Sequence, residues 1–144
     1  ELYRETFIPL ADAAGCVLLL PLFPAGIGEP GELHGYKYLA WGGVHYDRVL
    51  LDMVDEASEQ VPVDAGRFLL TGFSGGGHFT HRFLYAHPER VRAAAVGAPG
   101  IVTLLDGERA WPAGIGDAEA TIGRAVEPSS VARVPIQIAV GADD

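Results

Sequence analysis

The sequence is poor in cysteine and in basic residues, and both shortages narrow what the protein does. Cys16 is the single cysteine among 144 residues, which excludes an intramolecular disulfide and a metal site built from cysteines. Lysine and arginine number 10 against 19 aspartates and glutamates, for a formal net charge of -9. An acidic surface repels nucleic acid phosphates, so the composition argues against DNA or RNA binding.

Long hydrophobic runs are missing as well. The longest strongly apolar stretch runs from Cys16 to Phe23 and contains Pro21. It is far shorter than the ~20 residues that a membrane-spanning helix needs, and it has the length of a buried strand. The chain begins with Glu1 rather than Met, and nothing near it resembles a signal peptide. We therefore expect the true N-terminus to lie upstream and leave the compartment open, with a lean to the cytoplasm.

What the chain does have is enough apolar material for one globular domain with a real core. Hydrophobic residues make up 49% of it and charged residues 20%. Short apolar runs alternate with amphipathic stretches, which is the pattern of an α/β fold with a mostly parallel sheet and helices on both faces. The predicted strands span residues 17–23, 67–72, 91–96 and 135–140, and the predicted helices span residues 7–14, 46–57 and 79–86.

Two stretches do not fit this alternation. Residues 25–43 are rich in glycine, proline and aromatic residues, so we expect a loop or a short lid there. Residues 100–133 form a long connection, within which Asp106-Gly107 favours a hairpin turn. Connections of this length inside a compact domain are usually functional. The second stretch is therefore interpreted as an excursion or cap over the site.

The most informative segment is Gly72-Phe73-Ser74-Gly75-Gly76, between a predicted strand and a predicted helix. Gly-x-Ser-x-Gly places a serine on a tight, strained turn, and we expect the residues two before and two after it to be too close for side chains. Gly72 and Gly76 meet that need. The helix N-terminus directs its dipole toward the turn, and the N–H of Gly75 is the predicted oxyanion donor. Ser74 is therefore the predicted catalytic nucleophile.

Glycine-rich turns also serve other functions. A dinucleotide-binding fingerprint needs Gly-x-Gly-x-x-Gly in register, and a P-loop needs Gly-Lys followed by Ser or Thr; neither is present. A serine in an ordinary glycine turn, or in a loop that cradles a phosphate, remains the alternative to catalysis.

Across nearly its whole length the sequence resembles the α/β-hydrolases, in particular their esterase and polyester-depolymerase-like members. The resemblance is carried by the serine turn, by residues 63–67 before it, by residues 85–91 after it, and by Val134-Pro135 leading to residues 141–144. Such a domain commonly runs to about 200–250 residues. The resemblance therefore implies that residues 1–144 are the central part of one α/β-hydrolase domain.

The same resemblance implies the rest of a catalytic triad, in the chain order serine, acid, histidine. The acid falls on Asp144, with Asp143 as the alternative, and an ordinary solvated acidic turn is the competing interpretation. The histidine is expected after Asp144 and a second oxyanion donor before Glu1. None of the chain's own histidines is chosen as the base; they are His34, His45, His78, His81 and His87.

The predicted function is hydrolysis of carboxylic esters through an acyl-enzyme on Ser74. A peptidase, a thioesterase or an acyltransferase on the same fold is the first alternative, since fold does not fix substrate. A non-catalytic binding protein is the second. The expected partner is a small-molecule ester or acyl compound, with no metal or organic cofactor, and the oligomeric state is open. Candidate walls of an aromatic substrate pocket are Tyr36, Trp41, Phe73 and Trp111.

Overall fold

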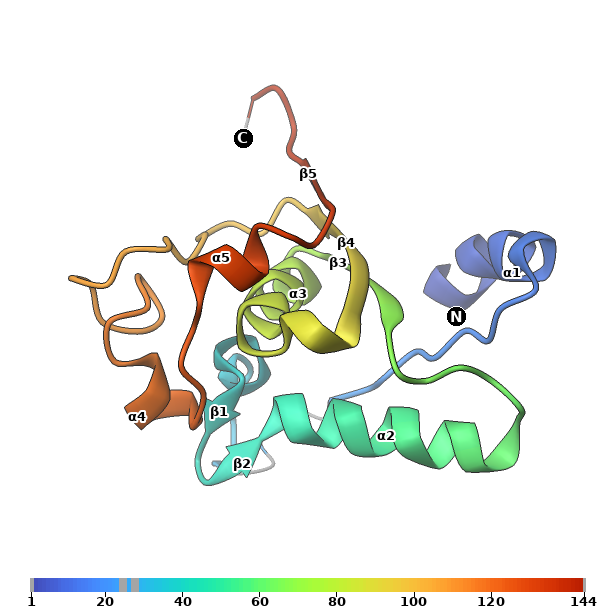
Figure 1. Cartoon of the computed structure of the whole chain (residues 1–144), viewed down its shortest axis with the longest axis horizontal. Coiled ribbons are helices and arrows are strands. Elements are labelled where there is room, and N and C mark those ends of the chain that lie inside the picture. Colours follow the sequence, from blue (N-terminus) through green and yellow to red (C-terminus); the bar gives the residue numbers. More distant parts are fainter. Residues whose placement is uncertain (1, 24–25, 27–28, 144) are drawn as a thin grey trace.

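The computed structural model of the protein describes residues 2–23, 26 and 29–143, and Figure 1 shows the arrangement of its elements. In chain order these are α1 (Leu2–Ala14), η1 (Gly35–Tyr38), β1 (Ala40–Trp41), β2 (Val44–His45), α2 (Tyr46–Gln60), β3 (Phe68–Phe73), α3 (Gly75–Ala86), η2 (Pro88–Arg90), β4 (Val91–Gly97), α4 (Ala118–Ile122), α5 (Pro128–Val131) and β5 (Ile136–Ala139).

The central sheet is parallel, with strand order β3-β4-β5. Leu70 lies opposite Ala94, and Ala94 lies opposite Ile136 on the next strand. Three of the four predicted strands are thereby confirmed as β3, β4 and β5, and each of them hydrogen-bonds to a neighbouring strand. All three predicted helices are also present, and each is longer than the apolar periodicity indicated.

Helix α3 covers one face of the sheet and contributes to the hydrophobic core. Its predicted apolar face, Phe79, Phe83 and Ala86, is buried and packs on one face of β3 and β4. Leu69 and Phe73, which alternate with the inward-facing residues of β3, are exposed on the other face. Helix α2 adds Tyr46 and Leu50 to the same core, and its partly buried Leu51 and Val54 pack against it.

The prediction of a strand at residues 17–23 is wrong. These residues follow α1 without secondary structure, and no described strand pairs with them. Val17 and Leu22 are exposed, and Figure 1 shows α1 set apart from the sheet. An apolar run without a pairing edge cannot satisfy its backbone groups as a strand does. Phe23 is the point where the segment joins the core, against Tyr36, Tyr46 and Phe79.

The predicted loop at residues 25–43 proves partly ordered. It contains η1 and then β1, which pairs antiparallel with β2 across a turn at Gly42 and Gly43. Both glycines have positive φ, 56° and 80°, as a two-residue hairpin turn of this hand requires. The expectation of a loop without regular elements is therefore wrong for residues 35–41.

The long connection at residues 100–133 holds α4 and α5 and packs against the core through buried Ile122 and Val131. The hairpin predicted at Asp106-Gly107 is wrong, because no strands flank that turn. The carbonyl of Asp106 instead accepts the N–H of Ile115 at 3.0 Å, which closes a compact loop. Within the described part of the chain, no helix combines the length and the apolar character needed to cross a bilayer.

Candidate active site

Ser74 stands alone between β3 and α3, in a backbone conformation that side-chain-bearing residues rarely adopt. Its φ is 53° and its ψ is -115°. Two backbone hydrogen bonds hold this conformation: Ser74 N–H donates to the carbonyl of Gly97 at 2.9 Å, and the Ser74 carbonyl accepts from His78 N–H at 3.0 Å. The turn is thus tied to the end of β4 and to the first turn of α3, while the serine itself is exposed.

The glycines around Ser74 differ in what they permit. A Cβ at Gly72 would collide with the backbone of Gly76 and stand 2.6 Å from the Thr80 hydroxyl oxygen. A Cβ at Gly77 would stand 2.6 Å from the carbonyl oxygen of Gly97. A Cβ at Gly76 would meet nothing within 4 Å among the described residues, so the expectation that Gly76 must lack a side chain for steric reasons is wrong.

Gly77 was missed by sequence reasoning. Three consecutive glycines, residues 75–77, signal that α3 begins against other backbone. They do not show which of the three glycines lies closest to the backbone of another segment. That information comes from β4, whose end lies against α3 in space and 20 residues away in sequence, counted from Gly77 to Gly97.

Gly75 is the first residue of α3, a helix of 12 residues. The first N–H groups of a helix have no partner within it, and the helix dipole adds a partial positive charge there. The predicted oxyanion donor therefore lies at an open helix N-terminus directly after Ser74. The 3-10 helix η1 borders this end: a Cβ at Gly75 would collide with the Tyr36 hydroxyl and stand 2.9 Å from Cε of Lys37.

Two histidines follow Ser74 on α3, and both make hydrogen bonds away from it. Nε2 of His78 accepts the N–H of Ile101 at 3.4 Å. Burial, followed by the nearby charge of Arg82, lowers the pKa of His78. His81 is buried, its Nδ1 donates to the carbonyl of Gly77 at 2.8 Å, and its Nε2 accepts the N–H of Thr103 at 3.1 Å. Burial lowers the pKa of His81 to about 4, so the ring is neutral at neutral pH.

The other histidines lie elsewhere. His87 caps the far end of α3, where its Nε2 is 2.7 Å from Oδ2 of buried Asp47. A helix of this length spans about 18 Å, which separates His87 from the serine turn. His45 lies in β2 and His34 is exposed beside Lys37. Among the described residues, no histidine ring hydrogen-bonds to the Ser74 side chain.

Arg82 is a buried residue that connects the segments around the serine turn. The sequence did not predict this role. Arg82 is 1% exposed. Its Nε donates to the Thr103 hydroxyl at 2.8 Å and its Nη1 donates to the carbonyl of Lys37 at 2.6 Å. Its guanidinium also lies over the rings of Tyr38 and Trp111, at 5.5 and 6.0 Å from their centroids. One side chain thus ties η1 and the long connection to α3, whereas an arginine on a helix is usually solvated.

The remaining predicted site residues are scattered. Trp111 is buried in the core, where its indole N–H donates to the carbonyl of Tyr38 at 3.0 Å. Trp41 is exposed and packs on Tyr38, with 5.5 Å between ring centroids. Phe73 is exposed on the sheet face away from α3. Asp143 lies exposed in the turn after β5, and Asp144 lies outside the described residues.

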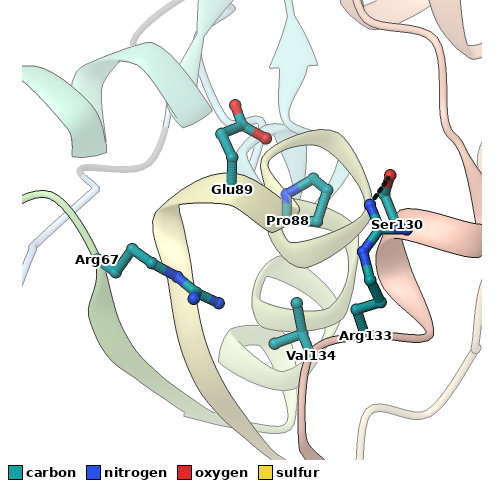
Figure 2. A pocket seen from close by; sticks show the side chains of 6 residues that line it. All are labelled: Arg67, Pro88, Glu89, Ser130, Arg133 and Val134. Carbon is teal, nitrogen blue, oxygen red and sulfur yellow. Dashed lines mark hydrogen bonds between the residues drawn. The ribbon is translucent and has the colours of Figure 1, made fainter.

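Two open cavities in the described part of the chain are lined by residues other than Ser74. Figure 2 shows the first, of about 370 Å³, which Arg67 and Arg133 approach from two sides. Arg67 precedes β3, whereas Ser74 follows it, and a six-residue strand spans ~20 Å. The second, of about 350 Å³, is bordered by Trp41 and His45. In the described ranges, no group of three or more His, Cys, Asp or Glu side chains is placed to hold a metal ion.

Comparison with protein-family models and with curated proteins finds no match. Among solved structures, the chain is similar to the crystal structure of LpqC, a poly(3-hydroxybutyrate) depolymerase from Bordetella parapertussis. The TM-score is 0.71 at 24% sequence identity, and the match covers 97% of this chain and 50% of that one. The chain has the α/β-hydrolase fold. It spans half the length of the depolymerase structure.

Proposed function

We propose that the protein is a serine hydrolase that cleaves carboxylic esters through an acyl-enzyme on Ser74. The observation that carries the proposal is the backbone at Ser74. Ser74 has a φ of 53° and lies between a parallel strand and the N-terminus of a helix. This supports the proposal, because a nucleophilic serine of this fold sits on such a strained turn. Strained non-glycine residues cluster at functional sites.

In the proposed reaction, Ser74 Oγ attacks the acyl carbon while a histidine takes the hydroxyl proton. The carbonyl oxygen becomes an oxyanion and accepts the N–H of Gly75. The C–O bond to the alcohol breaks, the histidine protonates the departing oxygen, and water then hydrolyses the acyl-enzyme by the same steps. This histidine would follow Asp144 in the chain. Asp144 would orient the histidine, with Asp143 as the alternative acid.

The substrate class is proposed from the neighbour. That protein is named as a poly(3-hydroxybutyrate) depolymerase, so esters of short 3-hydroxyalkanoic acids are the first compounds to test. A thioester, an amide and a peptide of matched acyl group complete the panel. Turnover confined to the thioester or the peptide would replace the ester proposal by one of the other reactions that this fold supports.

The decisive variant is Ser74→Ala in the full-length protein, assayed on p-nitrophenyl esters. Loss of a triad serine costs roughly a million-fold in kcat, so no activity above background is expected. Ser129→Ala is the matched control, because Ser129 is an exposed serine on α5, and it should leave activity unchanged. Retained hydrolysis in Ser74→Ala would overturn the proposal.

One observation favours a non-catalytic role: among the described residues, no ring of the five histidines hydrogen-bonds to the Ser74 side chain. A fluorophosphonate probe tests this on the full-length protein, because the probe reacts only with an activated serine. Labelling that maps to Ser74 supports the hydrolase. Absence of labelling, with the protein folded, supports a binding protein.

A further inference from the structure

Tyr36 presents its hydroxyl to the first residue of α3, and this contact explains a glycine that the serine turn does not require. Gly75 occupies the unrestricted position after the serine in Gly-x-Ser-x-Gly. No positive φ is found at Gly75, so backbone strain does not demand a glycine there. A Cβ at Gly75 would nevertheless collide with the Tyr36 hydroxyl and stand 3.3 Å from the Tyr36 Cζ. Gly75 therefore leaves room for that hydroxyl.

The hydroxyl lies beside the N-terminal end of α3. Every Cα–Cβ bond of an α-helix tilts toward the N-terminus, so the space next to a Cβ at Gly75 lies beside the open end of α3. Ser74 immediately precedes this end, and the free N–H of Gly75 belongs to it. The Tyr36 hydroxyl thus stands beside the predicted oxyanion donor, from an element far away in sequence.

The ring of Tyr36 is held in place. It stacks on Phe23 with 5.8 Å between centroids and 29° between planes. The backbone on its C-terminal side is fixed twice: the carbonyl of Lys37 accepts from Arg82 at 2.6 Å, and the carbonyl of Tyr38 accepts from the Trp111 indole at 3.0 Å. A donor fixed before the substrate arrives needs no reorganisation during the reaction, which is what makes oxyanion stabilisation effective.

The hydroxyl also has a proton to give. Among the described residues it has no hydrogen-bond partner of its own. Burial, followed by the neighbouring Tyr3, raises the pKa of Tyr36 above its ordinary 10, so the phenol is protonated at neutral pH. Lys37, the other side chain at this place, directs its ammonium to Nδ1 of His34 at 2.7 Å and is therefore already engaged.

We propose that the Tyr36 hydroxyl is a second oxyanion donor, which acts together with the N–H of Gly75 on the carbonyl oxygen of the acyl group. This inference rests on the proposed function and deepens it. It also assigns within the chain a role that the sequence alone placed before Glu1. When the carbonyl oxygen gains negative charge, the phenol shortens its hydrogen bond to that oxygen but keeps its proton.

The test is Tyr36→Phe in the full-length protein, assayed with p-nitrophenyl butyrate. Phenylalanine retains the ring that stacks on Phe23 and removes only the hydroxyl. We expect kcat to fall about 100-fold, the scale for loss of one oxyanion donor, with KM within about twofold because the interaction forms in the transition state. Tyr38→Phe is the matched control from the same 3-10 helix, and it should retain activity within about threefold.

A second measurement separates hydrogen bonding from structural support. The infrared carbonyl stretch of the acyl-enzyme at Ser74 reports donors on the acyl oxygen, and it should move to higher frequency in Tyr36→Phe but not in Tyr38→Phe. The inference is overturned if Tyr36→Phe matches Tyr38→Phe, if only KM changes, or if kcat falls while the stretch stays in place. Failure of the proposed function itself shows differently, as full activity in Ser74→Ala.

Discussion

The unit β3–α3–β4 and the segment at residues 16–23 are both rich in apolar residues. The apolar side chains of the first are largely buried, whereas several of those in the second are exposed to solvent. Phe83 on α3 is fully buried, whereas Leu22 is 80% exposed. The serine turn belongs to the first region and is tied to β4 through the carbonyl of Gly97. The second region continues from α1 without pairing to any described strand.

The difference teaches that apolar composition favours a strand only where a pairing edge is available. Each residue of a strand leaves one N–H and one carbonyl to satisfy. In β3 and β4 the parallel ladder satisfies these groups, and α3 covers one face. Residues 16–23 have a similar composition, but no strand in the described ranges pairs with them. Four predictions test this contrast, from the largest expected effect to the smallest.

Phe83→Ala should have the largest effect. Phe83 contacts Phe68, Phe79 and His87 at ring-centroid distances of 5.9, 5.7 and 4.8 Å. Removing a buried phenylalanine loses transfer free energy and leaves a cavity, at a cost of about 4 kcal/mol. Urea unfolding of the two proteins measures the loss. A change under about 1 kcal/mol would mean that α3 is not the centre of the core.

The second prediction concerns pH, through His81. Burial lowers the pKa of His81 to about 4, so the unfolded chain binds a proton at higher pH than the folded protein. The contribution of the neutral His81 ring to the free energy of unfolding is fully present above the ordinary histidine pKa of about 6.5. It is lost as the pH falls toward 4, which lowers the free energy of unfolding by up to about 3 kcal/mol. Urea unfolding from pH 7 to pH 4 should show this loss in the wild type and a smaller one in His81→Gln.

The control for that experiment is His34→Gln, which changes an exposed histidine. It should retain the acid dependence of the wild type. If His34→Gln reduced that dependence as much as His81→Gln, the protonation that matters would not be that of the buried ring.

Gly72→Ala should be next in size. The new methyl group would overlap the backbone of Gly76 and approach the Thr80 hydroxyl, and overpacking of this kind costs about 2 kcal/mol. Gly76→Ala is the matched control, since a Cβ there meets nothing within 4 Å among the described residues. Because alanine favours helix by about 1 kcal/mol over glycine, thermal unfolding should show Gly76→Ala unchanged or more stable. Equal losses in the two variants would contradict the difference between these glycines.

Leu22→Ala should have the smallest effect. A side chain this exposed contributes within about 0.5 kcal/mol, so the free energy of unfolding should barely change. A loss of about 2 kcal/mol or more would show that residues outside the described part of the chain bury Leu22. In that case the apolar side chains of both regions would be buried, and the difference between the regions would not hold.

Sequence patterns correctly predicted the elements whose packing partners lie near them in the chain. The periodicity of Phe79, Phe83 and Ala86 predicted α3, and the apolar runs beside it predicted β3 and β4. Patterns failed where the outcome depended on distant partners. Arg82 can be buried because the Thr103 hydroxyl and the carbonyl of Lys37 accept its hydrogen bonds. No local sequence pattern indicates these acceptors. Asp144, the predicted acid, remains a prediction.

By itself the sequence determined the α/β alternation and the position of Ser74 between a strand and a helix, because hydrophobic periodicity and the Gly-x-Ser-x-Gly spacing act over a few residues. Only the tertiary structure decided that residues 16–23 pair with none of the described strands and that Gly77, not Gly76, meets the end of β4. It alone brought the Tyr36 hydroxyl to Gly75. These outcomes depend on close approach between segments far apart in the chain, which no local pattern encodes.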